Sequence, residues 1–187
     1  MSFFKNYLRK IFSFKVDTPE PEKIHTVKYH NYDAELVDKL KKDHQSLLSL
    51  AGEMKTLIDT KKWTKLPPVL TKFRKEFCDH IFTENGYLYH HLKFHFSDDQ
   101  DTSDLIGVFK RDMTDIQKGV LEFTKTWSVQ GAVKADPKMF VSQFKGVAEA
   151  LGERVDREED VLYELYDGIA IKEKQNALSG MENGVAV

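Results

Sequence analysis

Apolar residues recur at alternating steps of three and four along most of this chain, which is the spacing of one buried face on an α-helix. No stretch shows the period-two alternation between turn residues that would predict a strand. The pattern predicts four long helices, at about residues 33–60, 67–91, 103–127 and 137–162. Amphipathic helices of this length, joined by short or moderate loops, predict an all-α, up-down-up-down four-helix bundle.

Residues suited to helix starts stand where three of these helices should begin. Pro67 or Pro68 fits the first turn of the second helix, because proline has no N–H that the first turn would need to satisfy. Ser103 is expected to cap the third helix. Asp136, followed by Pro137, predicts the start of the fourth.

The N-terminal segment departs from the bundle pattern. Residues 1–15 carry four basic side chains and no acid. Their apolar residues Phe4, Leu8, Ile11 and Phe12 share one helical face. This predicts an extra short, basic amphipathic helix, which could make a peripheral contact with an anionic membrane, dock onto a protein partner or fold back over its own bundle.

Composition shifts divide the rest of the chain. Residues 16–32, with Pro19 and Pro21, show no sustained apolar period and are expected to form an extended linker. The bundle itself is expected to span residues 33–170. Residues 171–187, ending NALSGMENGVAV, are expected to be a disordered tail.

Charge and cysteine content narrow the classes of function. The 187 residues carry a formal net charge of -2, with acids and bases interspersed, so nucleic-acid binding is not expected. The single cysteine, Cys78, cannot form an internal disulfide, and it is expected to be a buried structural thiol. No apolar run approaches the roughly 18 to 20 residues needed to span a bilayer. A cytoplasmic location is therefore predicted.

Five ionisable residues interrupt the apolar stripes of three helices: His44, His80, Glu84, Arg154 and Glu158. Buried ionisable groups are costly unless they pair with one another or hold a metal. Two interpretations stay open for this polar layer. It is either a metal site or a metal-free, salt-bridged network that fixes the register of the helices.

The second and fourth helices contain an internal echo. The segment DHIFTENGYLY at 79–89 and the segment ERVDREEDVLY at 153–163 share a glutamate, a leucine and a tyrosine at matching positions. In this register His80 corresponds to Arg154, and Glu84 corresponds to Glu158. The echo predicts a site with pseudo-twofold symmetry, in which one half has lost its histidine.

At these residues the chain resembles the hemerythrin-like, or HHE cation-binding, family over about residues 33–167. That family is a four-helix bundle with a non-haem di-iron centre between its helices. The resemblance implies as ligands His44, which lies in KKDHQSLL, the pair His80 and Glu84, and Glu158. Histidines that the family places on its third and fourth helices are missing, because this chain has none after His95.

The missing histidines imply an incomplete site that holds at most one iron ion and no other cofactor. A permanent guanidinium at Arg154 would repel a further cation while it satisfies Glu84 or Glu158, so it is expected to replace a metal electrostatically or to form a salt bridge.

The other pair of histidines, His91 and His95, is expected to lie at a solvated helix end.

A weaker resemblance links the segment ALGERVDREE, residues 150–159, to anti-sigma regulators of the regulator-of-sigma-D type. It implies a protein-binding role. The function expected first is therefore a regulatory or sensing module with an eroded cation site. The alternative is a metal-free interaction module, such as an anti-sigma-like transcription regulator, that binds its partner through the N-terminal helix or an outer bundle face. No nucleophile motif or phosphate-binding loop is present, so the chain is not expected to be an enzyme.

Overall fold

The computed structural model describes residues 32–171 of the chain. The predictions made for residues 1–15, for most of the linker and for nearly all of the tail lie outside this range. Within residues 32–171 the structure contains helices and turns and no strand. None of these helices combines the length and the hydropathy that a membrane-spanning segment needs.

The helices follow one another with short connections. Their bounds are Leu36–Asp59 for α2, Leu66–Thr83 for α3, Tyr89–His95 for α4, Gln100–Trp127 for α5, Ala132–Ala135 for α6 and Pro137–Arg157 for α7. A 3-10 turn, η1 (Trp63–Lys65), precedes α3. Two π-helical turns continue the longer helices: η2 (Glu84–Leu88) joins α3 to α4, and η3 (Glu158–Leu162) joins α7 to a last helix at 163–171.

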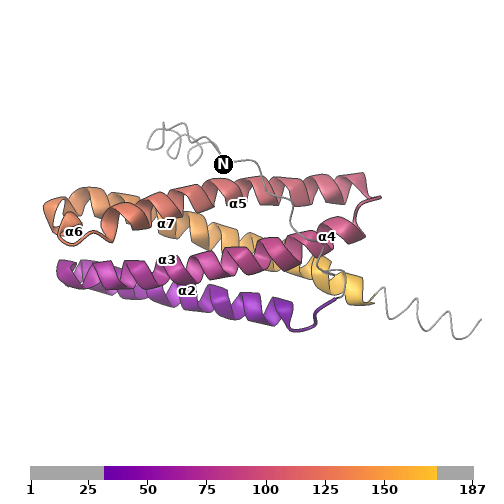
Figure 1. The fold of residues 1–187 in the computed structure, drawn as a ribbon, viewed down its shortest axis with the longest axis horizontal. Coiled ribbons are helices and arrows are strands. Elements are labelled where there is room, and N and C mark those ends of the chain that lie inside the picture. Colours follow the sequence, from indigo (N-terminus) through magenta and orange to yellow (C-terminus); the bar gives the residue numbers. More distant parts are fainter. Residues whose placement is uncertain (1–31, 172–187) are drawn as a thin grey trace, which may run out of the picture.

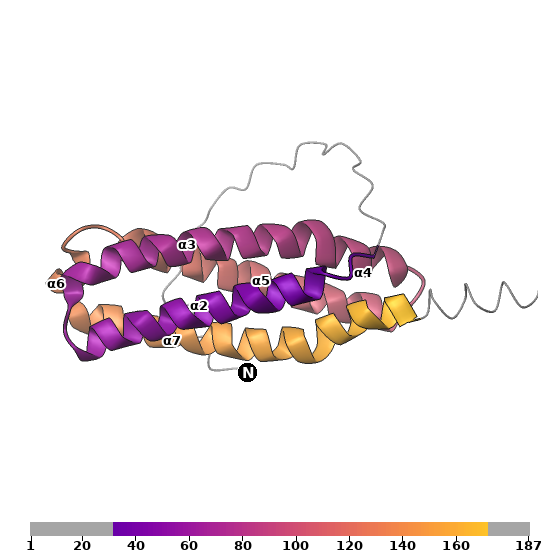
Figure 2. The ribbon, with the colours of Figure 1, turned by 90° about the horizontal axis from the view of Figure 1, so that it is seen from below.

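The long segments α2, α3 with α4, α5, and α7 with the last helix lie side by side, and the short α6 closes one end of the bundle (Figure 1). Helix α2 packs against α3 and α7, and α5 packs against the same two helices. Figure 2 shows α2 and α7 running together along one face of the bundle. The predicted all-α, up-down-up-down four-helix bundle is therefore confirmed, apart from the N-terminal helix, which falls outside the described residues.

Aspartate side chains cap the two helices of the second half. At α7 the Asp136 carboxylate accepts a hydrogen bond from the Met139 N–H at 3.0 Å, as its position before Pro137 predicts. At α5 the prediction of Ser103 as the cap is wrong. Asp99 accepts from the Thr102 N–H at 3.1 Å and starts the helix one turn earlier. Asp99 accepts from a free N–H of the first helical turn, which is the capping role that the sequence predicts for Ser103.

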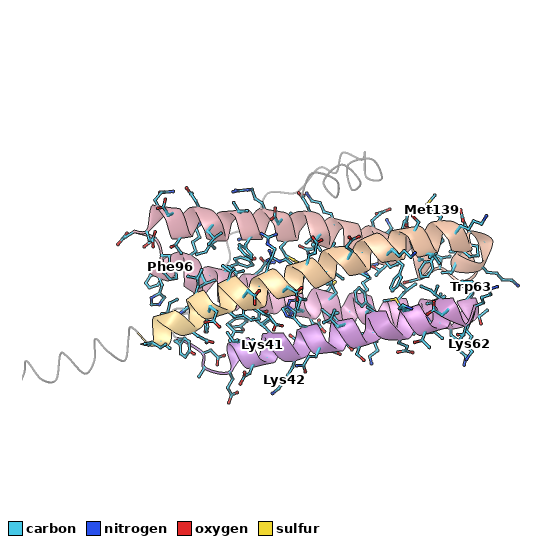
Figure 3. All side chains as sticks on the ribbon, turned by 180° about the vertical axis from the view of Figure 1, so that it is seen from behind. Lys41, Lys42, Lys62, Trp63, Phe96 and Met139 are labelled. Carbon is cyan, nitrogen blue, oxygen red and sulfur yellow. The ribbon has the colours of Figure 1, made fainter. Side chains whose placement is uncertain are left out.

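The hydrophobic core forms two blocks. One block, rich in phenylalanine, lies between the C-terminal halves of α2 and α5, nearly all of α3 and the N-terminal part of α7. The ring centroids of Phe123 and Phe140 in this block are 5.6 Å apart. The other block joins the start of α2 and of α5 to α4 and to the last helix. Figure 3 shows Trp63 and Met139 at one end of the bundle, near the phenylalanine-rich block, and Phe96 at the opposite end. The polar layer lies between the two blocks.

The burial of two side chains differs from the sequence prediction. His91 is buried, at 2 % exposure, whereas a solvated helix end was expected. The bundle continues past this point, because Tyr166 of the last helix covers the His91 ring at 4.9 Å between centroids. Cys78 is exposed rather than buried, since it follows the core residue Phe77 and therefore turns about 100° away from the core face.

Candidate metal centre

Five segments, which belong to three of the long helical rods, bring the five polar residues together. His44 comes from α2 and His80 from the last turn of α3. Glu84 and Glu158 are the first residues of the two π-helical turns, and Arg154 lies one turn before Glu158 on α7. Each of the five is at most 3 % exposed. The layer that the sequence pattern predicts is therefore buried, which is the condition under which its charges need partners.

The π-helical turns coincide with the internal echo. Both are five residues long, and both run from the glutamate to the leucine that the two sequence segments share. Such turns are rare, occur mostly as insertions within α-helices and are frequent at functional sites. The two repeated segments therefore match in structure as well as in sequence, and Arg154 lies at the position that corresponds to His80.

His44, His80 and Glu158 could hold one ion together. Each offers one ligand atom, and these atoms lie within 4.8 Å of one another. The His44 Nε2 atom is 3.2 Å from Glu158 Oε2, and the centroids of the two imidazole rings are 4.7 Å apart. Two imidazoles and one carboxylate are the donor set typical of non-haem iron(II) sites with open coordination positions.

Arg154 fills the other half of the layer. Its Nε donates a hydrogen bond to Glu158 and its Nη2 donates one to the Tyr89 hydroxyl. Its Nη1 donates to the backbone carbonyl of Phe109 at 3.2 Å, and the guanidinium carbon lies 5.0 Å from the centre of the Phe109 ring. Helix α5, whose apolar stripe contains none of the five ionisable residues, thus contributes a carbonyl that helps to hold the guanidinium.

Glu84 lies in the layer but outside the group of three ligands. Within residues 32–171 neither of its carboxylate oxygens has a hydrogen-bond partner, and Oε1 is 3.8 Å from Arg154 Nη2. Burial, together with the nearby Glu158 carboxylate, raises the pKa of Glu84 well above its usual range. A buried carboxyl of this kind needs either a proton or a cation to neutralise it.

The electrostatics of the layer separate its two histidines. Burial lowers the pKa of His44, but hydrogen bonds to Glu158 and Glu159 outweigh burial, so the pKa ends above its usual value. Burial and the neighbouring His44 lower the pKa of His80 to about 4. His80 is therefore neutral at neutral pH, which leaves it a nitrogen lone pair for a metal.

The surroundings of the layer include side chains that sequence reasoning did not assign to the site. The Tyr163 hydroxyl lies 3.3 Å from His44 Nε2, and Glu159 Oε1 lies 2.8 Å from His44 Nδ1. Asp43 Oδ2 is 3.7 Å from His80 Nδ1. The echo already pairs Tyr163 with Tyr89, and both hydroxyls contact the layer, so the repeated tyrosine was a usable signal. Nothing in the sequence distinguishes Glu159 from its exposed neighbours.

Fold and layer together define a helical bundle with a buried set of cation ligands. The family model for the hemerythrin HHE cation-binding domain matches residues 35–166, and the chain belongs to this family. No curated protein and no solved structure matches the chain.

Three of the described residues could hold one ion. The ligand atoms of His44, His80 and Glu158 lie within 4.8 Å of one another, and Glu158 also accepts a hydrogen bond from the Arg154 guanidinium. Two ions bridged by carboxylates need more donors than this layer offers, and a fixed positive charge repels a second ion.

Proposed function

We propose that this bundle binds one iron ion through His44, His80 and Glu158 and acts as a regulatory or sensing module rather than as an enzyme. The observation that carries the proposal is the convergence of three ligand atoms within 4.8 Å in a buried layer. Glu84 stays a predicted fourth ligand. Its Oε1 atom is 3.8 Å from Arg154 Nη2, so turning toward an ion would break no hydrogen bond to the guanidinium.

A single ion follows from the pseudo-symmetry of the layer. Arg154 stands at the position equivalent to His80, and its guanidinium is positively charged at all physiological pH values. It already contacts Glu158, the carboxylate that both halves share. We infer that the guanidinium supplies permanently the charge that a second metal ion would otherwise supply.

A sensing role is favoured by the place of the ligands in the fold. The three ligands come from α2, α3 and the η3 turn, so a bound ion would link three of the four long helical segments. Metal binding to such a set adds its free energy to the stability of the bundle. Open coordination positions on the ion would let a small molecule alter that link.

Elemental analysis of the full chain, expressed with iron and purified without a tag under anaerobic conditions, tests the proposal. We expect about one equivalent of iron per chain. His80→Ala should remove it, whereas His90→Ala, which changes an exposed imidazole on α4, should retain it. A wild-type protein that takes up no iron, even after incubation with Fe²⁺, would contradict the proposal.

One observation favours the alternative function, a metal-free interaction module. Both His44 nitrogens already have carboxylate partners, at 3.2 and 2.8 Å, so this part of the layer is satisfied without metal. Such a protein would bind its partner through the N-terminal segment or an outer face of the bundle, as an anti-sigma-like regulator would. Pull-down of a purified sigma subunit by metal-free protein would support it. Failure of that pull-down, with iron present in the chain, would exclude this variant.

A further inference from the structure

The His44 ring lies between two consecutive carboxylates. Glu158 Oε2 is 3.2 Å from Nε2, and Glu159 Oε1 is 2.8 Å from Nδ1, on the opposite edge of the ring. The two glutamates differ in exposure: the Glu158 side chain is 2 % exposed, and the Glu159 side chain is 34 % exposed. Glu158 belongs to the group of three ligands, whereas Glu159 does not.

The position of Glu159 determines which nitrogen of His44 can bind a metal. A neutral imidazole carries its hydrogen on one nitrogen and a lone pair on the other, and an ionised carboxylate can only accept a hydrogen bond. The contact at 2.8 Å therefore places a hydrogen on Nδ1. In the metal-free protein Nε2 also faces a carboxylate, Glu158, and the raised pKa of His44 favours a second hydrogen there. When that second hydrogen leaves, Glu159 keeps the one on Nδ1, and Nε2 is the nitrogen that can bind an ion.

We propose that Glu159 is a positioning residue for the metal site, because it holds His44 in the tautomer and ring orientation in which Nε2 can bind an ion beside Glu158. The inference rests on the proposed function. Carboxylates that accept the second N–H of a metal-binding histidine fix the ring and increase the basicity of the binding nitrogen. Glu159 has the geometry for this role without being a ligand itself.

The second histidine lacks an equally close partner. Asp43 Oδ2 is 3.7 Å from His80 Nδ1, beyond hydrogen-bond range, and the same oxygen pairs with Lys39 at 3.0 Å. In the internal echo, Glu159 corresponds to Asn85, which is exposed. The close carboxylate therefore distinguishes His44 from His80 and is not a consequence of the repeat.

Metal affinity and the tautomer of His44 test this role separately. We expect Glu159→Ala to weaken Co²⁺ binding, followed by absorbance under anaerobic conditions, by about 10-fold to 100-fold. Glu159→Gln keeps a neutral acceptor, so it should recover part of that loss. Asp160→Ala removes the adjacent exposed carboxylate and is the matched control, with affinity expected within about 2-fold of wild type.

Nitrogen NMR of the His44 ring in metal-free protein provides a readout that general destabilisation would not produce. At a pH above the raised pKa of His44, where the ring is neutral, wild type and Glu159→Gln should show the hydrogen on Nδ1, whereas Glu159→Ala should show a mixture of tautomers or the hydrogen on Nε2. Equal Co²⁺ affinity in Glu159→Ala and Asp160→Ala, or an unchanged tautomer in Glu159→Ala, would overturn the proposal. If wild type binds neither Co²⁺ nor Fe²⁺, the proposed function fails, and the tautomer still decides whether Glu159 orients His44.

Discussion

The π-helical turns η2 and η3 are built alike and used differently. Both run for five residues from a buried glutamate to a fully buried leucine. One turn before the glutamate, however, α3 presents the neutral imidazole of His80 and α7 presents the guanidinium of Arg154. The first group can give a lone pair to a metal, and the second can only donate hydrogen bonds.

The pKa values of the two glutamates shift in opposite directions. The pKa of Glu84 is raised by burial and by Glu158. Burial would also raise the pKa of Glu158, but its hydrogen bond to His44 and the charge of Arg154 outweigh burial and lower it. Equivalent positions of one fold thus hold a carboxyl that favours its proton and a carboxylate that favours its charge. The helical scaffold thus fixes where the two glutamates lie, and the hydrogen bond to His44 together with the Arg154 guanidinium favours the charged form of Glu158.

The largest effect is expected from removal of the guanidinium. Arg154→Met leaves Glu84 and Glu158 buried without their shared cation, which should destabilise the metal-free protein by about 3–5 kcal/mol. Chemical denaturation measures the loss. Arg157→Met is the control, because Arg157 pairs with Asp112 at 3.3 Å in a partly exposed position, and it should cost less than about 1 kcal/mol. Equal costs for the two variants would show that the guanidinium does not balance the layer.

Equivalent leucine substitutions in the two turns should destabilise the protein equally. Leu88 and Leu162 end η2 and η3, and both are 0 % exposed. We expect Leu88→Ala and Leu162→Ala each to cost about 3 kcal/mol of unfolding free energy, through lost burial and a remaining cavity. Denaturation of the metal-free protein compares them. A cost confined to one leucine would mean that the packing of the turns differs as much as their charges do.

The glutamates should give opposite pH dependences. Because the folded-state pKa of Glu84 is raised above 4.5, the stability that its neutral carboxyl contributes is complete below pH 4.5 and is lost as pH rises through the folded pKa. Glu84→Gln should therefore stabilise the metal-free protein at pH 7 by on the order of 1 kcal/mol, and less toward pH 4. For Glu158, whose pKa is lowered, stability is lost as pH falls below 4.5, so Glu158→Gln should destabilise at pH 7.

Denaturation curves at several pH values check these signs. Glu164→Gln, at an exposed position on the last helix, is the control. Stabilisation by both buried substitutions, or by neither, would contradict the assignment of opposite roles to the two glutamates.

The smallest effect is expected within η2 itself. Gly86 has open space around the position of a Cβ atom, and its φ is not positive. Gly86→Ala should therefore stabilise the fold by about 0.5 kcal/mol, because alanine loses less backbone entropy on folding. Thermal unfolding detects this gain. A loss of stability would show that η2 needs glycine for its π-helical geometry.

The helices and the polar layer could be predicted from sequence because both follow local rules. Apolar spacing located the four helices, and Asp136 before Pro137 located the start of α7. Asp99 was missed because Ser103, four residues later, satisfies the same capping preference. The burial of His91 depends on Tyr166, which is distant in the sequence and which no local pattern pairs with it.

The detail of the site could not be predicted, because it depends on the π-helical turns and on distances between helices. In the run of acids 158–160, spacing alone does not decide which carboxylate enters the core and which one contacts His44 from outside. Likewise, Arg154 could be assigned to the layer, but its contacts with Tyr89 and with the Phe109 carbonyl require the neighbouring helices to be in place.

The proposed function requires a layer that has room for one metal ion beside a fixed guanidinium. Anaerobic titration of the full chain with Fe²⁺, with bound iron counted after equilibrium dialysis, tests this most directly. We predict saturation at about one equivalent per chain. Saturation at two equivalents, or no binding at concentrations where other non-haem iron proteins are loaded, would contradict it.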